Sequence, residues 1–233
     1  MRLEDRKEQI LDLIVRHYVS TAVPVSSGVV FEKNKLDVSS ATIRNTMLEL
    51  DQEGYLIQPY TSAGRVPTEK GYRYFIKYLA QERTPPQRTQ REIDRVLTGL
   101  EDDIDNVFDD LSRVLARHLK LFSGVGVIGN EHRIFSHGVA EVLREPEFAE
   151  HNMAVQFAHM VDHMEDELER MSDSKKMSTI DIGTFGMVSA TFCDKDVGRC
   201  VLFSIGPRRM NYEAAQSLLK YTADDIIREM SKA

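Results

Sequence analysis

The stretch VSSATIRNTMLELDQEGYLIQPYTSAGRVPTEKGYRYF, from Val38 to Phe75, determines how the first part of this chain is organised. Its beginning predicts an α-helix that starts at Ser39 or Ser40 and ends near Glu53. A serine at the start can accept a hydrogen bond from the free N–H groups of the first turn. Gly54 follows at the other end, where helices often stop at a residue in the left-handed conformation. The helix therefore has a start signal and a stop signal.

The rest of this stretch predicts two short strands joined by a polar loop. Tyr55–Tyr60 is typical of a strand, Thr61–Gly64 (TSAG) of a loop, and Arg65–Pro67 of a short return strand. Thr68 can then cap a further helix that continues to about Gln81.

Two more helices are predicted before the stretch. Residues 4–18 place their apolar side chains largely on one face, which indicates an amphipathic helix. A short helix can follow Pro24, with Ser26 as its cap, and reach Phe31 or Glu32. The order helix, helix, helix, strand, loop, strand is that of a winged helix-turn-helix domain, so we predict this fold for residues 1–82.

The third of these helices has one buried side and one small polar side. Ile43, Met47 and Leu50 follow the i, i+4, i+7 spacing of a buried stripe. The other side carries short polar groups and one forked donor: Ser40, Ala41, Thr42, Arg44, Asn45 and Glu49. A recognition helix places such residues in the major groove, where small side chains allow close approach and Arg or Asn can pair with base edges.

The predicted DNA contacts extend to both neighbours of this helix face. Ser39, Ser40 and the free N–H groups of the first turn suit a phosphate oxygen. In the wing, Thr61, Ser62 and Arg65 can lie along the DNA backbone or reach the minor groove. Winged helices also bind proteins, and this second interpretation stays open because the domain is nearly neutral. The first turn of the helix and the wing loop lack acidic residues, which favours double-stranded DNA.

Composition sets the broad class of the protein. The chain has 233 residues, 42% of them hydrophobic and 29% charged, which is typical of a globular protein. No window approaches the roughly 18 to 20 apolar residues of a membrane span, and the N-terminus lacks the apolar core of a signal peptide. We therefore expect a cytoplasmic protein without a membrane partner. Residues 1–83 hold 12 of the 30 basic and 11 of the 37 acidic residues, so the net charge of −7 arises in residues 84–233.

A change of composition indicates a domain boundary. Residues 83–91, RTPPQRTQR, lack a residue that could contribute to a core, so a linker is predicted at residues 83–92 and a second domain at 93–233. Asn211 can cap its last helix. Its predicted strands are Gly124–Ile128, Thr179–Ile182, Met187–Cys193 and Arg199–Ile205. The chain is thus predicted to be α+β.

The second domain begins with a heptad-like stripe whose members step by four and three residues: Ile93, Leu97, Leu100, Ile104, Val107, Leu111 and Val114. This spacing is typical of a helix that meets a partner helix, as in a dimer seam. A helix that covers a sheet in its own subunit can have the same stripe. Both alternatives stay open at the level of the sequence.

Other patterns give no indication of an enzyme. Gly124, Gly126 and Gly129 match the G-x-G-x-x-G spacing, but they follow a helical pattern instead of a strand, so we expect a glycine-rich strand and no nucleotide cofactor. His159 and His163 lack a third ligand at fixed spacing, so no metal site is predicted.

Two further features could be functional or structural. Cys193 and Cys200 flank a probable turn and could face each other across a hairpin, although thiols are expected in the cytosol. Arg208 and Arg209 could contact an anion or a chaperonin; alternatively, they pair with acidic neighbours in a structural turn.

The string from Ser39 to Phe75 closely resembles the DNA-binding domain of the heat-inducible transcription repressors of the HrcA family. GVAEVLREPEF and IGPRRMNY, farther along the chain, resemble the family's second, GAF-like domain. The resemblance implies a homodimeric repressor of chaperone and chaperonin genes that binds an inverted-repeat operator, is released on heat stress, and is assisted by a GroEL-type chaperonin.

The chain departs from the family pattern in one respect. Only NEHRIFSH separates GVGVIG from GVAEVL, where the family has an inserted dimerisation domain. We therefore predict a reduced GAF-like domain, in which the stripe from Ile93 to Val114 is the candidate substitute for the dimer contact. The alternative function is a protein-interaction adaptor that uses the winged helix and the GAF-like domain to bind partners.

Overall fold

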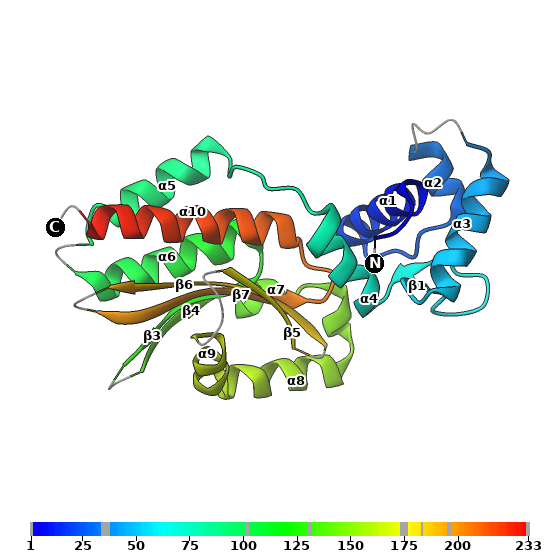
Figure 1. Ribbon diagram of the computed structural model, residues 1–233. Helices are drawn as coiled ribbons and strands as arrows, with labels where there is room; N and C mark the ends of the chain where they lie inside the picture. Colours follow the sequence, from blue (N-terminus) through cyan, green and yellow to red (C-terminus); the bar gives the residue numbers. More distant parts are fainter. Residues whose placement is uncertain are drawn as a thin grey trace. The chain divides into compact units, whose positions relative to one another are not determined.

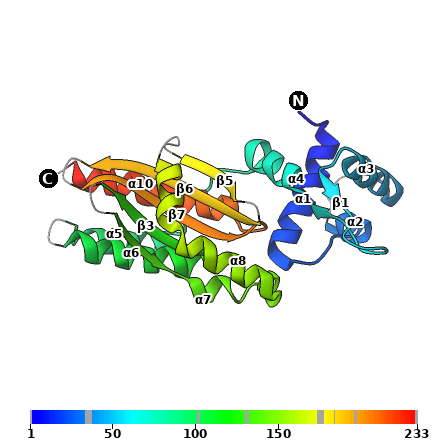
Figure 2. The same ribbon diagram turned by 90° about the horizontal axis from the view of Figure 1, so that it is seen from below.

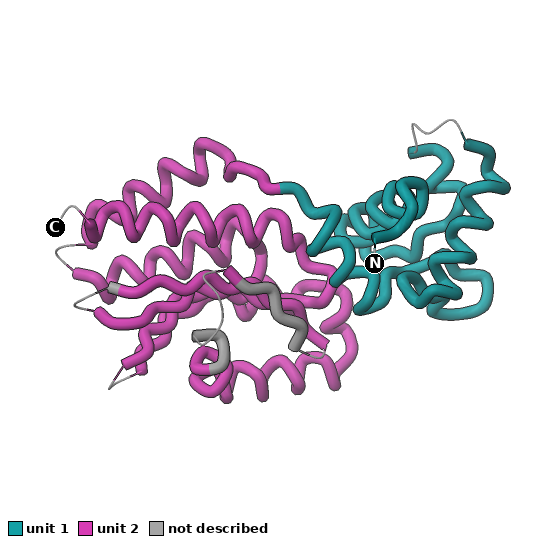
Figure 3. The backbone as a smooth tube through the Cα atoms, in the orientation of Figure 1, with its two compact units in different colours: residues 1–81 teal, residues 82–233 magenta. Residues whose placement is uncertain are grey.

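The computed structural model describes residues 2–33, 38–100, 103–129, 132–172, 177–182, 184–194 and 197–231. The chain divides into two compact units, residues 1–81 and 82–233, which we call the N-terminal and the C-terminal unit (Figure 3).

The N-terminal unit is built from helices around a small core and a two-stranded sheet (Figure 1). Its elements are α1 (Asp5–Thr21), α2 (Ser27–Lys33), α3 (Ser40–Gln52), β1 (Leu56–Ile57), β2 (Val66–Pro67), α4 (Glu69–Tyr74) and the π-helical turn η1 (Phe75–Leu79). Ile10 and Ile14 of α1 and Ile43 and Leu50 of α3 are completely buried, so the apolar faces of these two helices form the core.

The strands of the wing are shorter than the sequence predicts. β1 pairs with β2 over only two residues on each strand, whereas the sequence predicts a strand over Tyr55–Tyr60. Pro59 cannot donate to a ladder, and a turn follows in which Ala63 N–H bonds to the Tyr60 carbonyl at 3.0 Å. Ser62 has a left-handed φ of 67° in this turn.

Close backbone approach fixes the base of the wing. Val25 and Arg65 form an isolated antiparallel bridge, with N···O distances of 2.9 and 2.8 Å. A Cβ on Gly64 would lie 2.4 Å from the carbonyl carbon of Val25, so a larger residue does not fit there. The wing is thereby tied to the segment that precedes α2.

The C-terminal unit is a five-stranded antiparallel sheet in the order β4-β3-β7-β6-β5. The strands are β3 (Phe122–Ile128), β4 (Arg133–His137), β5 (Met177–Ile182), β6 (Phe185–Asp194) and β7 (Gly198–Pro207). α6 (Ile104–Leu119) and α10 (Tyr212–Met230) cover one face, and α5 (Gln87–Leu97) packs against these two helices (Figure 1). α8 (His151–Asp162) and α9 (Met164–Ser172) cover the other face, after the short α7 (Val139–Val142) and η2 (Pro146–Ala149) (Figures 1 and 2).

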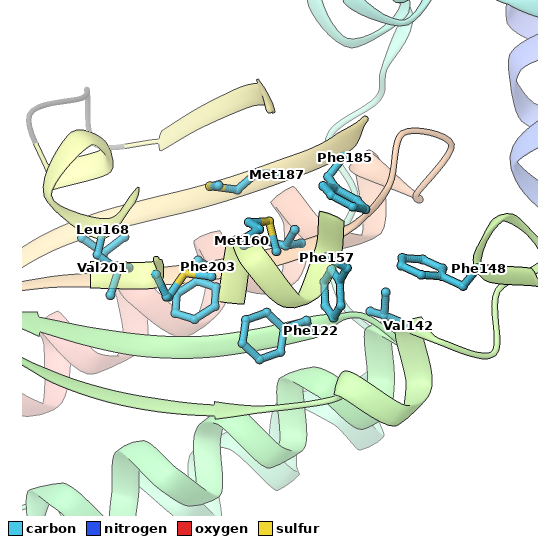
Figure 4. Close-up of a cluster of buried hydrophobic side chains, with 12 residues drawn as sticks. Phe122, Val142, Phe148, Phe157, Met160, Leu168, Phe185, Met187, Val201 and Phe203 are labelled. Atoms are coloured by element: carbon cyan, nitrogen blue, oxygen red, sulfur yellow. The ribbon is translucent and has the colours of Figure 1, made fainter. Parts of the chain in front are cut away.

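An aromatic cluster fills the space between the sheet and α8 (Figure 4). The ring of Phe157 lies 5.7 Å from that of Phe122 and 5.4 Å from that of Phe148, both in edge-to-face contact. On the same face, a Cβ on Gly124 would lie 2.6 Å from the ring of Phe203. One glycine of the G-x-G-x-x-G match, Gly124 of β3, therefore makes room for the ring of Phe203 on the neighbouring strand β7, as a glycine in a strand can.

The predicted linker at 83–92 is wrong in its second half, because α5 begins at Gln87 and includes Glu92. Pro85 is buried, and the carbonyl of Arg83 accepts a hydrogen bond from Ser217 Oγ of α10 at 2.6 Å. Arg83 also forms an ion pair with the buried Glu213 at 3.3 Å. Contacts to α10 therefore order this segment although it carries few apolar residues.

The stripe from Ile93 to Val114 belongs to two helices, whereas its spacing predicts a single helix. α5 ends at Leu97, and Asp103 caps α6 by accepting a hydrogen bond from Asn106 N–H at 3.1 Å. Ile104 is half-buried, and the other six members are buried within the same chain: Ile93, Leu97, Leu100, Val107, Leu111 and Val114. Since a single chain already covers these side chains, their burial favours packing within the subunit over a dimer seam.

The two cysteines do not face each other. β6 and β7 pair Cys193 with Arg199 and Phe192 with Cys200. Because residues paired across strands share a face and neighbours along a strand alternate, Cys193 and Cys200 lie on opposite faces of the hairpin. Both cysteines are free.

Candidate nucleic-acid interface

Capping and burial determine how α3 presents its polar side. Ser39 Oγ accepts a hydrogen bond from Thr42 N–H at 3.2 Å and lies 2.9 Å from Thr42 Oγ1. Ile43 and Met47 are buried, as the spacing predicts, and Thr46 is buried beside them. Ser39 is therefore the N-cap of α3, and part of its capacity to bind a phosphate is used within the helix.

The opposite side of α3 is open. Ser40, Ala41, Arg44 and Asn45 are exposed, and Thr42 is half-buried. The side chains of Arg44 and Asn45 form no hydrogen bond or ion pair with any residue that the structure describes. Their donors, and the amide oxygen of Asn45, are free to bind another molecule.

A groove of about 440 Å³ lies between the start of α2, α3 and the wing. It brings together four of the residues that the sequence predicts for DNA binding: Arg44, Asn45, Ser62 and Arg65. Ser39, Ser40, Ala41, Thr42 and Thr61 do not line it. Sequence reasoning missed other lining residues, namely Ser26, Ser27, Met47, Leu48, Gln58, Ala63 and Gly64.

Ion pairs neutralise the acidic residues in the second half of α3. Lys7 Nζ of α1 lies 3.1 Å from Glu49 and 2.6 Å from Glu53. Hydrogen bonds to Glu53 and Glu49 raise the pKa of Lys7 above its ordinary value, so the lysine stays charged. Asp51 lies 2.5 Å from Arg65 Nε. Both acidic residues of α3, Glu49 and Asp51, therefore have cationic partners, whereas Arg44 has no acidic partner among the described residues.

This arrangement changes the interpretation of Arg65. The sequence predicts a wing arginine that reaches toward DNA, but the side chain is only 19% exposed and joins the base of the wing to α3 through Asp51. The wing is also held by Gln58 Nε2, which donates to the Ala63 carbonyl at 3.0 Å. Arg65 is therefore placed to position the wing, and its contact with a phosphate stays a prediction.

The other candidate sites belong to the C-terminal unit and show no sign of a binding site among the described residues. Arg209 forms a bidentate ion pair with Glu147 and a further hydrogen bond to Glu145 in the C-terminal unit. Burial lowers the pKa of Arg209, but its bonds to these two carboxylates outweigh that effect and raise it. His159 and His163 are exposed. Over the described ranges, no group of three or more His, Cys, Asp or Glu residues could hold a metal ion.

No helix in the described part of the chain combines the length and the apolar character that a membrane crossing requires.

A winged helix-turn-helix unit followed by a GAF-like α+β unit defines the architecture of the molecule. A crystal structure of a hypothetical protein at 2.2 Å resolution has the same fold, with a TM-score of 0.78 over 99% of each chain at 17% sequence identity. The family model described as HrcA protein C terminal domain matches residues 80–215, more than half of the chain. The chain belongs to the HrcA family, as the resemblance of its motifs predicts.

Two curated relatives have high local identity. The heat-inducible transcription repressor HrcA of Kineococcus radiotolerans is 46% identical over 114 residues, which are 49% of this chain and 33% of the relative. The protein of the same name from Pelotomaculum thermopropionicum is 41% identical over 117 residues, which are 50% of this chain and 34% of the relative. The match thus spans about a third of the length of each relative.

Proposed function

We propose that this protein is a transcription repressor that binds an inverted-repeat DNA operator as a homodimer, with the open side of α3 in the major groove. The observation that carries the proposal is the unpaired state of Arg44 and Asn45 on α3, beside a groove that the wing closes. Arginine and asparagine are the side chains that pair in bidentate fashion with guanine and adenine, respectively.

The proposal includes the genes and the signal. The names of the relatives, heat-inducible transcription repressor, support the control of heat-shock genes such as those of chaperones and chaperonins. In a dimer, two copies of α3 would enter successive major grooves about 34 to 36 Å apart. Heat would release the operator by destabilising the C-terminal unit, because loss of the dimer removes the avidity of two half-sites. A GroEL-type chaperonin as a partner stays a prediction from the family resemblance.

The test is a fluorescence-anisotropy titration against three duplexes. These are an inverted repeat from a chaperonin promoter, its single half-site, and a scrambled sequence of the same length and composition. We expect tight binding to the repeat, weaker binding to the half-site and the weakest to the scrambled duplex. Equal, weak binding to all three would refute sequence-specific repression.

The same titration at several salt concentrations separates DNA binding from the adaptor alternative. Neutralised phosphates release counterions, so the affinity of a DNA-binding protein falls steeply with salt. A flat salt dependence with weak binding would instead support a module that binds a polypeptide.

A further inference from the structure

Leu48 is a large apolar side chain on the open side of α3. Its exposed fraction is 49%, whereas its neighbour Met47 is 5% exposed and Leu50 is completely buried. Leu48 also lines the groove that contains Arg44 and Asn45. A single exposed leucine is common in proteins, so its position relative to these polar side chains is the informative point.

Helix geometry places Leu48 on the surface that the two polar side chains share. At 3.6 residues per turn, Ala41, Arg44, Asn45 and Leu48 fall within an arc of about 100°, opposite the buried stripe. Leu48 follows Arg44 by one turn, which puts the two side chains next to each other. Whatever surface Arg44 and Asn45 meet, Leu48 meets as well.

The acidic residues near Leu48 on α3 already have cationic partners, and one of these ion pairs, Asp51 with Arg65, borders the same groove. The carboxylates of Glu49 and Asp51, the nearest acidic residues along α3, are held by Lys7 and Arg65. A surface that accepts a guanidinium, an amide and an isobutyl group within one and a half turns must itself be mixed polar and apolar. The major groove is such a surface, and its apolar group is the 5-methyl of thymine.

We propose that Leu48 is a specificity-determining residue that contacts the 5-methyl group of a thymine in each half-site. This inference rests on the proposed function, since it requires α3 in the major groove. Four residues along a helix advance about 6 Å, and base pairs are about 3.4 Å apart. The thymine therefore lies about two base pairs from the base that Arg44 meets.

The experiment couples a change in the protein to a change in one DNA atom group. Thymines of the chaperonin-promoter inverted repeat are replaced, one symmetric pair at a time, by deoxyuridine, which lacks the 5-methyl but pairs identically. At one position we expect wild-type affinity to fall about fourfold per half-site, the factor that corresponds to one buried methyl group. Leu48→Ala should weaken binding to the thymine duplex by at least as much and show no further loss with deoxyuridine at that position.

Two controls keep the result interpretable. Ile57→Ala removes an apolar side chain of the wing that is 51% exposed and does not line the groove, so its response to deoxyuridine should equal that of wild type. Thermal melts should show that Leu48→Ala folds, since the side chain is half exposed in the native protein. If the wild type prefers the repeat over the scrambled duplex but no thymine couples to Leu48, this inference alone is overturned. If the wild type shows no such preference, the proposed function fails and the inference fails with it.

Discussion

Arg44 and Asn45 are the side chains of α3 that we expect to discriminate between base pairs. Both are exposed, and neither has a partner among the described residues, so binding DNA breaks no existing bond. Arg44→Ala or Asn45→Ala should each cost on the order of 1 to 3 kcal/mol on the operator and relax base preference at one position of each half-site. Titrations against operators with single base-pair changes measure both effects. Equal losses on operator and scrambled duplex would mean that these side chains bind only the backbone.

Arg65 is expected to act differently, through its ion pair with Asp51. Arg65→Ala removes one cation and leaves the Asp51 carboxylate unpaired beside the groove, so affinity should fall by a similar factor on operator and scrambled duplex. Adding Asp51→Asn removes the unpaired negative charge and should restore part of the loss. Anisotropy titrations of the single and double variants form a double-mutant cycle. The positioning role would be excluded by additive effects of the two substitutions.

At this scale the sequence predicts the exposed face of α3 but only four of the eleven residues that line the groove. The helical period separates buried Ile43 from exposed Arg44, so the face that bears donors is readable without a structure. The role of Leu48 cannot be predicted from the sequence, because an apolar residue next to a buried stripe is ordinarily assigned to the core. The pairing of Arg65 with Asp51 cannot be predicted either, because ion pairs depend on tertiary positions. The i+4 spacing of Leu48 from Arg44 was the available signal.

Among the secondary-structure elements, α5 shows how tertiary contacts override composition. Its polar side chains bind neighbours: Glu92 contacts His118 at 2.8 Å and also Arg117, and Asp94 accepts a hydrogen bond from Tyr221 OH at 2.7 Å. The hydrogen bond from His118 in particular lowers the pKa of Glu92. Residues 83–91 have no apolar side chains that would indicate a helix packed on a core, so composition alone predicts a linker. The polar contacts that order this segment depend on tertiary positions. The end of α5 at Leu97 and the cap of α6 at Asp103 likewise interrupt a stripe whose spacing is continuous in the sequence.

The contact between α5 and α10 contains a buried carboxyl group. Asp225 is 5% exposed, and burial, followed by its hydrogen bond with Asp94, raises its pKa above 3.8. Tyr221, Arg228 and Glu229 also face this site. Burial and the bond to Asp94 also raise the pKa of Tyr221 to about 12, so the phenol remains a donor at neutral pH.

We expect Asp225→Asn to stabilise the protein at neutral pH. A carboxyl whose pKa is higher in the folded than in the unfolded state binds more protons when folded, so stability falls as pH rises from 3.8 through the raised value. An asparagine can donate to Asp94 without carrying a charge, and its gain should be on the order of 1 kcal/mol at pH 7 and vanish near pH 4. Chemical denaturation at both pH values measures this. Asp224→Asn, one position earlier on the exposed side of α10, is the matched control. A loss of stability at pH 7 would show that the bond of Asp225 to Arg228 dominates.

At the scale of the whole molecule, the two units have separate cores and separate proposed roles. In the proposed mechanism, the N-terminal unit binds DNA, and the C-terminal unit maintains the dimer. The order of elements in the N-terminal unit was readable from the sequence because caps and turns are local signals. The order of strands in the sheet was not, because β3 and β7 are far apart in the chain and pair through non-local contacts. Heat release, as proposed, depends on the C-terminal unit losing its core while the N-terminal unit stays folded.

Phe157→Ala tests this division. Phe157 is 1% exposed and also contacts the ring of Phe185 at 5.6 Å, so its truncation should cost about 3 to 5 kcal/mol. For a unit of this size the melting temperature should fall by roughly 10 °C. At temperatures between the melting temperature of the variant and that of wild type, the variant should bind the full repeat no better than the half-site, because each N-terminal unit would then bind alone. Half-site affinity should equal that of wild type.

The measurement combines circular dichroism with anisotropy titrations at stepped temperatures. Val155→Ala, on the same helix but 38% exposed, is the matched control and should leave both the melt and the operator affinity nearly unchanged. A preference of Phe157→Ala for the full repeat that persists after its C-terminal unit has melted would contradict the proposed heat mechanism. If the preference disappears together with that transition, the stability of the aromatic cluster sets the temperature at which the operator is released.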